Sequence, residues 1–276
     1  MNDKTVEVEK NKGITIVRLN RPEVRNAINE QMSQGLTQAI KDAAGDDGTK
    51  VIVITGKGQA FCSGADFRFG KVREGTQATE QAEDLQSVHN EIKKGNLLHG
   101  LQLDINLALQ RLGKPVIAMV NGDAVGAGMD IALSCDMRVG SQDARFSVAY
   151  TRMAVVPDGG ATWLLPRLVG LGKALELILT GGLVSAEEAY RIGILNTLTT
   201  SDNLEEATMK LASKIANGPP IANRLSKMLV YKGLETDLET ALQFLSACIP
   251  ITTSSRDHQE AIKSFAEKRP PAFEGR

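Results

Sequence analysis

The sequence predicts an α/β fold, because apolar runs typical of buried strands alternate with helix-forming segments through the first two thirds of the chain. Two of these runs are continuous and rich in β-branched residues, as strands covered on both faces are: KVIVITG at 50–56 and PVIAMVNG at 115–122. The last third carries helix signals but few strand signals. We therefore expect a single α/β domain with a helical appendage.

The N-terminal residues predict a hairpin followed by a helix. From Val6, apolar and polar residues alternate, break at Lys12-Gly13 and alternate again up to Asn20, which indicates two antiparallel strands. Asn29 can cap a helix that ends near Gly45. The apolar residues of that helix share one face: Met32, Leu36, Ala39, Ile40 and Ala43.

Between the two continuous strands, residues 71–100 are polar and carry no firm strand signal. We interpret them as a mobile segment that leads into a helix over Leu101 to Leu112. A long loop without secondary structure in a compact domain is often functional, so this segment is a candidate lid.

After residue 122 the pattern predicts an apolar helix, MDIALSCD, and a short strand, MRVGS. Further along, Ser185 with Glu188 and Thr236 with Glu239 have the spacing of capping boxes. An apolar stripe of Leu204, Ala207, Leu211 and Ile215 predicts a helix that Gly218-Pro219-Pro220 ends, and a final helix is expected near 257–268. We place the boundary between a core and a helical region at 1–200 and 201–276.

Composition excludes several classes of protein. The 42% apolar side chains, with 26 glycines, exclude disorder, and 32 basic against 33 acidic residues give no reason to expect nucleic acid or an anionic membrane as partner. Three cysteines without a CxxC pair indicate buried thiols in a reducing compartment. With neither a signal peptide nor an apolar run long enough to span a membrane, we expect a soluble, cytoplasmic protein.

Two short glycine turns follow strands, AFCSGADF at 60–67 and NGDAVGAGMD at 121–130. A glycine turn that opens a helix leaves backbone N–H groups unpaired at the positive end of the helix dipole, which suits a carbonyl oxygen that becomes an oxyanion. By spacing alone, turn geometry explains these glycines as well.

Five aspartates near these turns are acidic candidates: Asp66, Asp123, Asp130, Asp136 and Asp158. Asp130 stands in an otherwise apolar helix, where a buried charge is costly unless it is paired or functional, and a first-turn carboxylate stabilised by the helix dipole is the alternative. Asp158 is either functional or the N-cap of the following helix.

Other candidates are weaker. His89, His99 and His258 do not stand beside a nucleophile, so a catalytic triad is not expected. Tyr150 fits a pocket wall or the core. Lys268 and Arg269, with Arg21 and Arg25, either meet phosphates or form a solvated charged face.

Several ordered motifs together resemble the crotonase superfamily, the enoyl-CoA hydratase/isomerase family. They are LNRPEVRNAIN, FCSGADF, KPVIAMVNGDAVGAGMDIALSCD, ARFSVAYTRMAVVPDGGATWLLPRLVG, LTGGLVSAEEAYRIGILN and SFAEKRPPAF, and they cover nearly the whole chain. The resemblance implies a ββα superhelix as spiral core over 1–200, a C-terminal helical trimerisation region over 201–276, and a homotrimer or dimer of trimers. It also implies an acyl-CoA thioester as substrate.

By this resemblance, the backbone N–H groups of Ala65 and Ala127 form an oxyanion hole for a thioester enolate. The residues that the resemblance implies for contacts with coenzyme A are Arg25, Ala27, Ala65, Asp66, Phe67, Arg68 and, reaching a neighbouring subunit's nucleotide, Lys268. It implies no metal and no redox cofactor, since the backbone stabilises the charge, and coenzyme A is part of the substrate.

Departures from the family pattern favour one reaction. Hydratases of the family have glutamates at the positions of Asp130 and Tyr150, and a phenol, with an ordinary pKa of about 10, is a poor base at neutral pH. Asp158 matches the acidic proton shuttle of several family isomerases, and its segment looks most like 1,2-epoxyphenylacetyl-CoA isomerases. A dehalogenase of the family has a similarly placed aspartate but also uses a histidine and a tryptophan. This chain has Leu103 and Tyr150 at those two positions, so we do not expect dehalogenation.

Three hypotheses follow. The first is an enoyl-CoA isomerase in which Asp158 carries the proton. The second is a hydratase that uses Asp130, and the third is an acyl-CoA-binding protein without catalysis. The sequence does not identify the acyl group.

Overall fold

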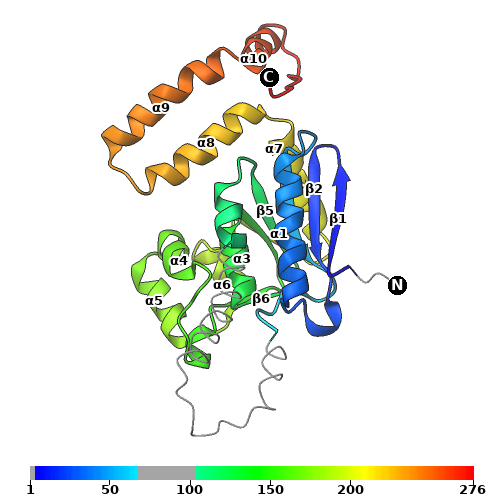
Figure 1. Cartoon of the computed structure of the whole chain (residues 1–276), viewed down its shortest axis with the longest axis vertical. Coiled ribbons are helices and arrows are strands. Elements are labelled where there is room, and N and C mark those ends of the chain that lie inside the picture. The colour runs from blue at the N-terminus through cyan, green and yellow to red at the C-terminus, as the bar shows by residue number, and fades with distance from the viewer. Residues whose placement is uncertain (1–3, 67–103) are drawn as a thin grey trace, which may run out of the picture.

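The computed structural model of the chain describes residues 4–66 and 104–276. The predicted lid at 71–100, the start of the helix predicted from Leu101, and Phe67, Arg68, His89, His99 and Leu103 lie outside the described residues. In the part described, strands and helices alternate as predicted and form an α/β fold (Figure 1).

The N-terminal hairpin and helix are confirmed. β1 (Val6–Asn11) pairs antiparallel with β2 (Ile14–Leu19). After a short 3-10 turn, η1 (Pro22–Val24), α1 (Glu30–Gly45) begins at Asn29, whose side chain accepts a hydrogen bond from the N–H of Met32 at 2.8 Å. The cap stabilises the first turn of the helix, as the Asn29 prediction requires.

The main sheet has six strands in the order β1-β2-β3-β5-β7-β10, and all but β1 run parallel. Its further strands are β3 (Val51–Gly56), β5 (Val116–Val120), β7 (Met137–Ser141) and β10 (Thr197–Thr199).

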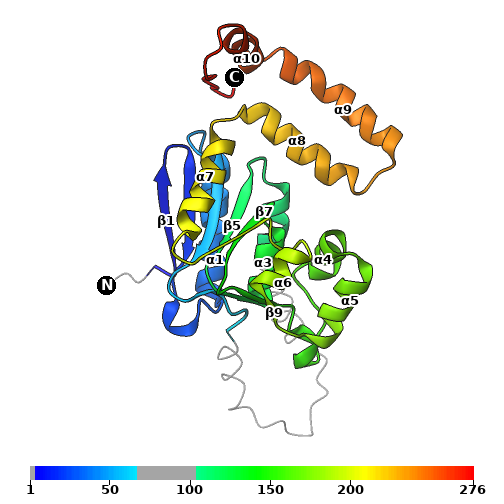
Figure 2. The same cartoon turned by 180° about the vertical axis from the view of Figure 1, so that it is seen from behind.

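Helices cover this sheet on both faces, which explains its continuous apolar runs. Ile52 and Ile54 pack in the core that contains α1, whereas Val51 and Val53 pack with α7 (Leu204–Ala216). Figure 1 shows α1 in front of the sheet and Figure 2 shows α7 on the opposite face. Alternate side chains of β3 therefore serve two different cores.

A second sheet of four short strands carries the glycine turns. Its order is β4-β6-β8-β9, with β4 (Ala60–Cys62), β6 (Asp123–Val125) and β8 (Arg145–Ser147) parallel and β9 (Val184–Ser185) antiparallel. The predicted apolar helix is α3 (Ala127–Ser134), which starts directly after β6 and is buried along its whole length.

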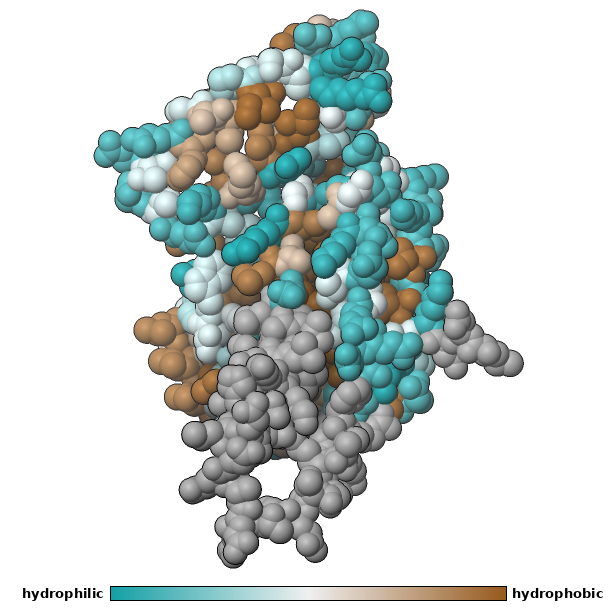
Figure 3. Space-filling view, in the orientation of Figure 1, coloured by the Kyte–Doolittle hydropathy of each residue, from teal (hydrophilic) through white to brown (hydrophobic). Residues whose placement is uncertain are grey.

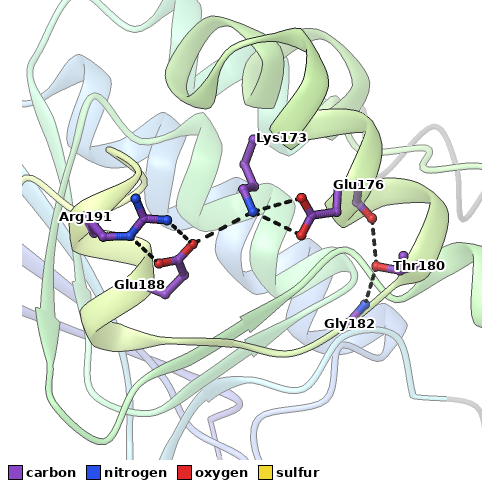
Figure 4. Close-up of polar contacts among 6 residues, drawn as sticks. All are labelled: Lys173, Glu176, Thr180, Gly182, Glu188 and Arg191. Atoms are coloured by element: carbon purple, nitrogen blue, oxygen red, sulfur yellow. Dashed lines mark hydrogen bonds and ion pairs between the residues drawn. The ribbon is translucent and has the colours of Figure 1, made fainter.

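Beside these strands lies a layer of η3 (Tyr150–Met153), α4 (Ala161–Val169), α5 (Leu171–Thr180) and α6 (Ala186–Arg191). The predicted capping box is confirmed, since Ser185 accepts from the N–H of Glu188. Figure 4 shows Lys173 of α5 between Glu176 of its own helix, at 2.8 Å, and Glu188 of α6, at 3.9 Å. The Lys173–Glu188 pair, with both side chains about one third exposed, joins α5 to α6.

The C-terminal residues form three helices that project from the core: α8 (Pro220–Gly233), α9 (Leu238–Thr253) and α10 (Arg256–Ala266) (Figures 1 and 2). The capping box predicted at Thr236 is wrong by one residue, because Asp237 caps α9 by accepting from the N–H of Thr240 at 2.9 Å. α7, assigned to the C-terminal region by the division at 201, packs on the main sheet.

A buried ion pair attaches α8 to the core. Lys227 lies 2.7 Å from Asp136, and only 7% and 14% of their side chains are exposed. Tyr231, one turn further along α8, donates to the same carboxylate at 2.9 Å.

The three cysteines, Cys62, Cys135 and Cys248, are free and buried, as predicted. Burial raises the pKa of the Cys62 and Cys135 thiols to about 12. Among the residues that the structure describes, no helix is both long and apolar enough to cross a membrane.

Candidate active site

The two glycine turns lie side by side because the strands before them are parallel neighbours. β4 pairs with β6, so both strands end at the same edge of the second sheet. A Cβ built on Gly64 would lie 2.9 Å from the carbonyl oxygen of Val125 and 3.7 Å from the nitrogen of Ala127, and one on Gly128 would lie 2.2 Å from the carbonyl oxygen of Cys62. Only glycine permits this approach, which brings the two turns into direct contact.

Each turn supplies a backbone donor that its own secondary structure does not use. In the first turn, Ile28 forms a β-bridge with Ala65. The N–H of Ile28 donates to the carbonyl of Gly64, and the N–H of Asp66 donates to the carbonyl of Ile28. The bridge therefore uses the carbonyl before Ala65 and the N–H after it. Ala127 is the first residue of α3, whose opening N–H groups have no partner within the helix. The Ala65 and Ala127 donors thus lie on adjoining turns, as an oxyanion hole needs.

Three of the five acidic candidates are held in ion pairs. Asp66 lies 2.9 Å from Arg21, and Asp136 is bound by Lys227 as described above. Asp123 accepts two hydrogen bonds from Arg145, at 2.8 and 2.9 Å, and a third from Arg25. These carboxylates have structural partners, which leaves Asp130 and Asp158.

Asp130 is fully buried in the first turn of α3. Its Oδ2 accepts a hydrogen bond from the Tyr150 hydroxyl, and its Oδ1 accepts one from the N–H of Ala161 at 2.9 Å. Burial raises the pKa of Asp130 to about 7, the charge of Asp158 raises it too, and the bonds from Tyr150 and Ala161 oppose the shift. Its carboxylate thus lies at the N-terminus of α4, where the helix dipole favours negative charge.

Tyr150, the first residue of η3, lies against this carboxylate and is partly buried. Burial raises the pKa of its phenol above its ordinary value, and both the charge and the hydrogen bond of Asp130 add to this. Asp158 raises it further in the same two ways. Tyr150 therefore joins the two aspartates in one cluster, as a donor and not as a base.

Asp158 is partly exposed and lies just before α4. Its alternative interpretation as an N-cap is wrong, because Gly160 occupies that position and no side chain caps the helix there. The neighbouring Gly159 packs directly against the Asp130 side chain, because a Cβ on Gly159 would lie 2.5 Å from the Asp130 Cγ. This glycine lets the turn that carries Asp158 close over the buried carboxylate.

The raised pKa of Asp130 predicts a pH-dependent effect of Asp130→Asn on stability. The unfolded chain loses this proton near pH 3.8 and the folded chain near pH 7, so the stability from the protonated group is complete below 3.8 and lost as the pH rises through 7. Asparagine cannot ionise. The unfolding free energy of the variant minus that of the wild type should therefore rise, by up to about 4 kcal/mol, between pH 4 and pH 8 in urea titrations. A difference that stays constant with pH would contradict the buried, titrating carboxyl.

Among the residues expected to contact coenzyme A, Arg25, Ala27 and Asp66 lie on the two segments joined by the Ile28–Ala65 bridge, next to the first glycine turn. The side chain of Arg25 is 57% exposed, and its backbone is left-handed (φ 55°). Arg21 connects the segments by donating to the carbonyl of Ala27 at 2.5 Å and to Asp66 at 2.9 Å.

Lys268, in contrast, follows α10, at the end of the molecule opposite the second sheet (Figure 1). Within one chain it therefore does not meet the glycine turns. Its expected contact with the nucleotide of a neighbouring subunit stays a prediction.

One residue near the cluster was not predicted. Asn106, in a helix at 104–111, is 6% exposed and donates from Nδ2 to the carbonyl of Gly159 at 2.6 Å. No sequence signal marks it, since its partner lies 53 positions away. Within residues 4–66 and 104–276 there is no group of three His, Cys, Asp or Glu side chains that could hold a metal ion.

The chain is similar to known proteins over nearly its whole length. A sequence model described as enoyl-CoA hydratase/isomerase matches residues 9–276. The chain is 34% identical to a short-chain-enoyl-CoA hydratase of Clostridium acetobutylicum, over 96% of this chain and 95% of the relative. It is 31% identical to a 1,2-epoxyphenylacetyl-CoA isomerase of Escherichia coli K12, over 96% of each.

Solved structures show the same fold. The chain superimposes on a crystal structure of an enoyl-CoA hydratase from Bacillus anthracis with a TM-score of 0.85 and 31% identity, covering 99% of this chain and 100% of that one. The predicted crotonase-like α/β class is therefore confirmed. With a matching family model, two curated relatives above 30% identity and this structural agreement, the chain belongs to the enoyl-CoA hydratase/isomerase family of the crotonase superfamily and is an enzyme of that family.

Proposed function

We propose that the chain is an enoyl-CoA isomerase in which Asp158 carries the proton. The observation that supports this choice is the different burial of the two aspartates. Asp130 is 0% exposed, and its two oxygens are bound by Tyr150 and by the N–H of Ala161. Asp158 is partly exposed, although its Oδ1 is buried, so of the two aspartates it is the one that a ligand can contact.

The proposed reaction moves a double bond in an acyl-CoA. The thioester oxygen accepts hydrogen bonds from the N–H groups of Ala65 and Ala127, which lowers the energy of an enolate. Asp158 removes a proton from the carbon next to the thioester, and the electron pair delocalises over the carbonyl and the double bond. The protonated Asp158 then returns the proton to the far end of the dienolate, so one carboxylate suffices.

Hydration is the second candidate function. Asp130 occupies the position of a hydratase glutamate, and a carboxyl with a pKa of about 7 can donate a proton at neutral pH. The relative from Clostridium acetobutylicum is named a short-chain-enoyl-CoA hydratase. Against hydration, Tyr150 replaces the second glutamate, and the raised pKa of its phenol keeps it protonated at neutral pH, so it cannot accept a proton from water.

Product analysis separates these functions. The purified chain is incubated with a 3-enoyl-CoA and, separately, with a trans-2-enoyl-CoA, and the products are identified by chromatography and mass. An isomerase converts the first substrate into the 2-enoyl thioester without a change of mass. A hydratase adds water to the second and gives 3-hydroxyacyl-CoA. Calorimetric binding of acyl-CoA without turnover of either would instead leave the third hypothesis, a binding protein.

We also propose that the chain works as a homotrimer or a dimer of trimers, through its C-terminal helices. Figure 3 shows hydrophobic side chains gathered over α8 and α9. Large apolar side chains exposed on α9 and α10 are Leu238, Leu242, Phe244, Leu245, Ile249, Ile251, Ile262 and Phe265. An apolar surface of this extent needs a partner in water, and light scattering measures directly how many chains associate.

A further inference from the structure

The turn that carries Asp158 is held from the side of the helix at 104–111 by Asn106. The Nδ2 of Asn106 lies 2.6 Å from the carbonyl oxygen of Gly159, the residue next to Asp158. A carbonyl oxygen only accepts hydrogen bonds, so the amide must present its NH₂ to Gly159, and the orientation of the side chain is determined. Asn106 is 6% exposed, which makes this a buried bond.

The same turn also contacts Asp130. The N–H of Ala161 donates to Asp130 Oδ1 at 2.9 Å, and Gly159 packs against the carboxylate so closely that a Cβ would lie 2.5 Å from Cγ. The backbone at Gly159 and Ala161 is therefore held by both the Asn106 amide and the Asp130 carboxyl. Asp158 directly precedes Gly159, so these contacts restrict the movement of its backbone.

The second polar atom of Asn106 indicates why an amide stands at this position. Its Oδ1 is buried, and no donor among the described residues reaches it. A buried acceptor without a partner destabilises a fold, and a leucine of similar size would avoid that cost. Among the described residues, the bond to Gly159 is the contact that favours an amide at this position.

We propose that Asn106 is a positioning residue for proton transfer: its bond to Gly159, together with the contacts of Asp130, holds the Asp158 carboxylate in place over the substrate. This inference rests on the proposed isomerase function. Asn106 acts through the backbone and does not touch the reacting atoms. Small displacements of a reacting group cost large factors in rate, so loss of this bond should affect the chemical step more than binding.

The test compares Asn106→Leu, Asn106→Ser and the wild type on a 3-enoyl-CoA. Asn223→Leu is the matched control, because Asn223 also donates its amide to a backbone carbonyl, that of Ile215 at 3.2 Å in the C-terminal helices. Asn106→Leu should lower kcat about 100-fold and leave the calorimetric Kd for acyl-CoA within about 2-fold. Its Tm should shift by less than about 3 °C, because the lost bond at Gly159 is offset by removal of an Oδ1 that has no partner among the described residues.

Two further readouts separate positioning from a structural role. With substrate deuterated next to the thioester, the isotope effect on kcat should increase in Asn106→Leu, since proton transfer becomes slower than the other steps. Asn106→Ser keeps a donor and should recover part of the rate, which also provides a second variant if the leucine does not fold. Asn223→Leu should match the wild type in kcat.

Each result decides a different claim when Asp158→Asn is measured alongside. Wild-type kcat in Asn106→Leu, or a fall in kcat that follows the loss of folded protein with an unchanged isotope effect, overturns the positioning role alone. A wild-type chain without isomerase activity, or an Asp158→Asn variant with full activity, overturns the proposed function and this inference with it.

Discussion

Asp158→Asn is expected to lower kcat for 3-enoyl-CoA isomerisation by about 10²- to 10⁴-fold, the usual contribution of a general base. The amide is the same size as the carboxylate but cannot take up the proton. Because Asp158 is partly exposed and does not cap α4, the fold should tolerate the change. Initial rates, with the Kd for acyl-CoA measured by calorimetry, check this directly.

The matched control for that variant is Asp42→Asn, on the exposed face of α1, where the carboxylate accepts a hydrogen bond from Gln38 at 2.7 Å. It should keep wild-type activity. If Asp158→Asn turned over 3-enoyl-CoA as fast as the control, Asp158 would have no part in the chemistry.

Gly64→Ala is expected to lower kcat by about 10²- to 10³-fold, the usual effect of losing one oxyanion donor. Gly64 has φ 99°, which L residues rarely adopt, and its new Cβ would lie 2.9 Å from the carbonyl oxygen of Val125. One of the two turns must therefore move, and the N–H groups of Ala65 and Ala127 would no longer converge.

The control for this substitution is Gly172→Ala in α5, where an added Cβ meets no atom within 4 Å. It should keep wild-type kcat and stabilise the chain by up to about 1 kcal/mol, since alanine is the better helix former. Equal kcat for Gly64→Ala and Gly172→Ala would show that the glycine turns do not bind the thioester oxygen.

Local patterns predicted the elements of this fold that depend on nearby residues. The break at Lys12-Gly13 and the Asn29 cap are interactions over a few positions, and both are confirmed. The Thr236 capping box failed because Asp237, one residue further on, also has the required side chain and makes the bond. Spacing alone does not separate two adjacent capping residues.

Sorting the aspartates needed contacts that are distant in sequence. Asp66 pairs with Arg21, which is 45 positions away in the sequence, and Asp123 pairs with Arg145, which is 22 positions away. Neither pairing therefore leaves a local sequence signal. The same holds for the bond from Asn106 to Gly159. In the sequence, the resemblance to the family singled out Asp130 and Asp158. The structure adds that Asp130 is buried and accepts hydrogen bonds from Tyr150 and from the first N–H of α4.

The most direct measurement is a crystal structure of the chain with a bound, unreactive acyl-CoA. We expect the thioester oxygen within hydrogen-bond distance of the N–H groups of Ala65 and Ala127, and an Asp158 oxygen within about 3.5 Å of the carbon next to the thioester. A complex in which Asp130 contacts that carbon, or in which the thioester oxygen lies away from both turns, would contradict the account.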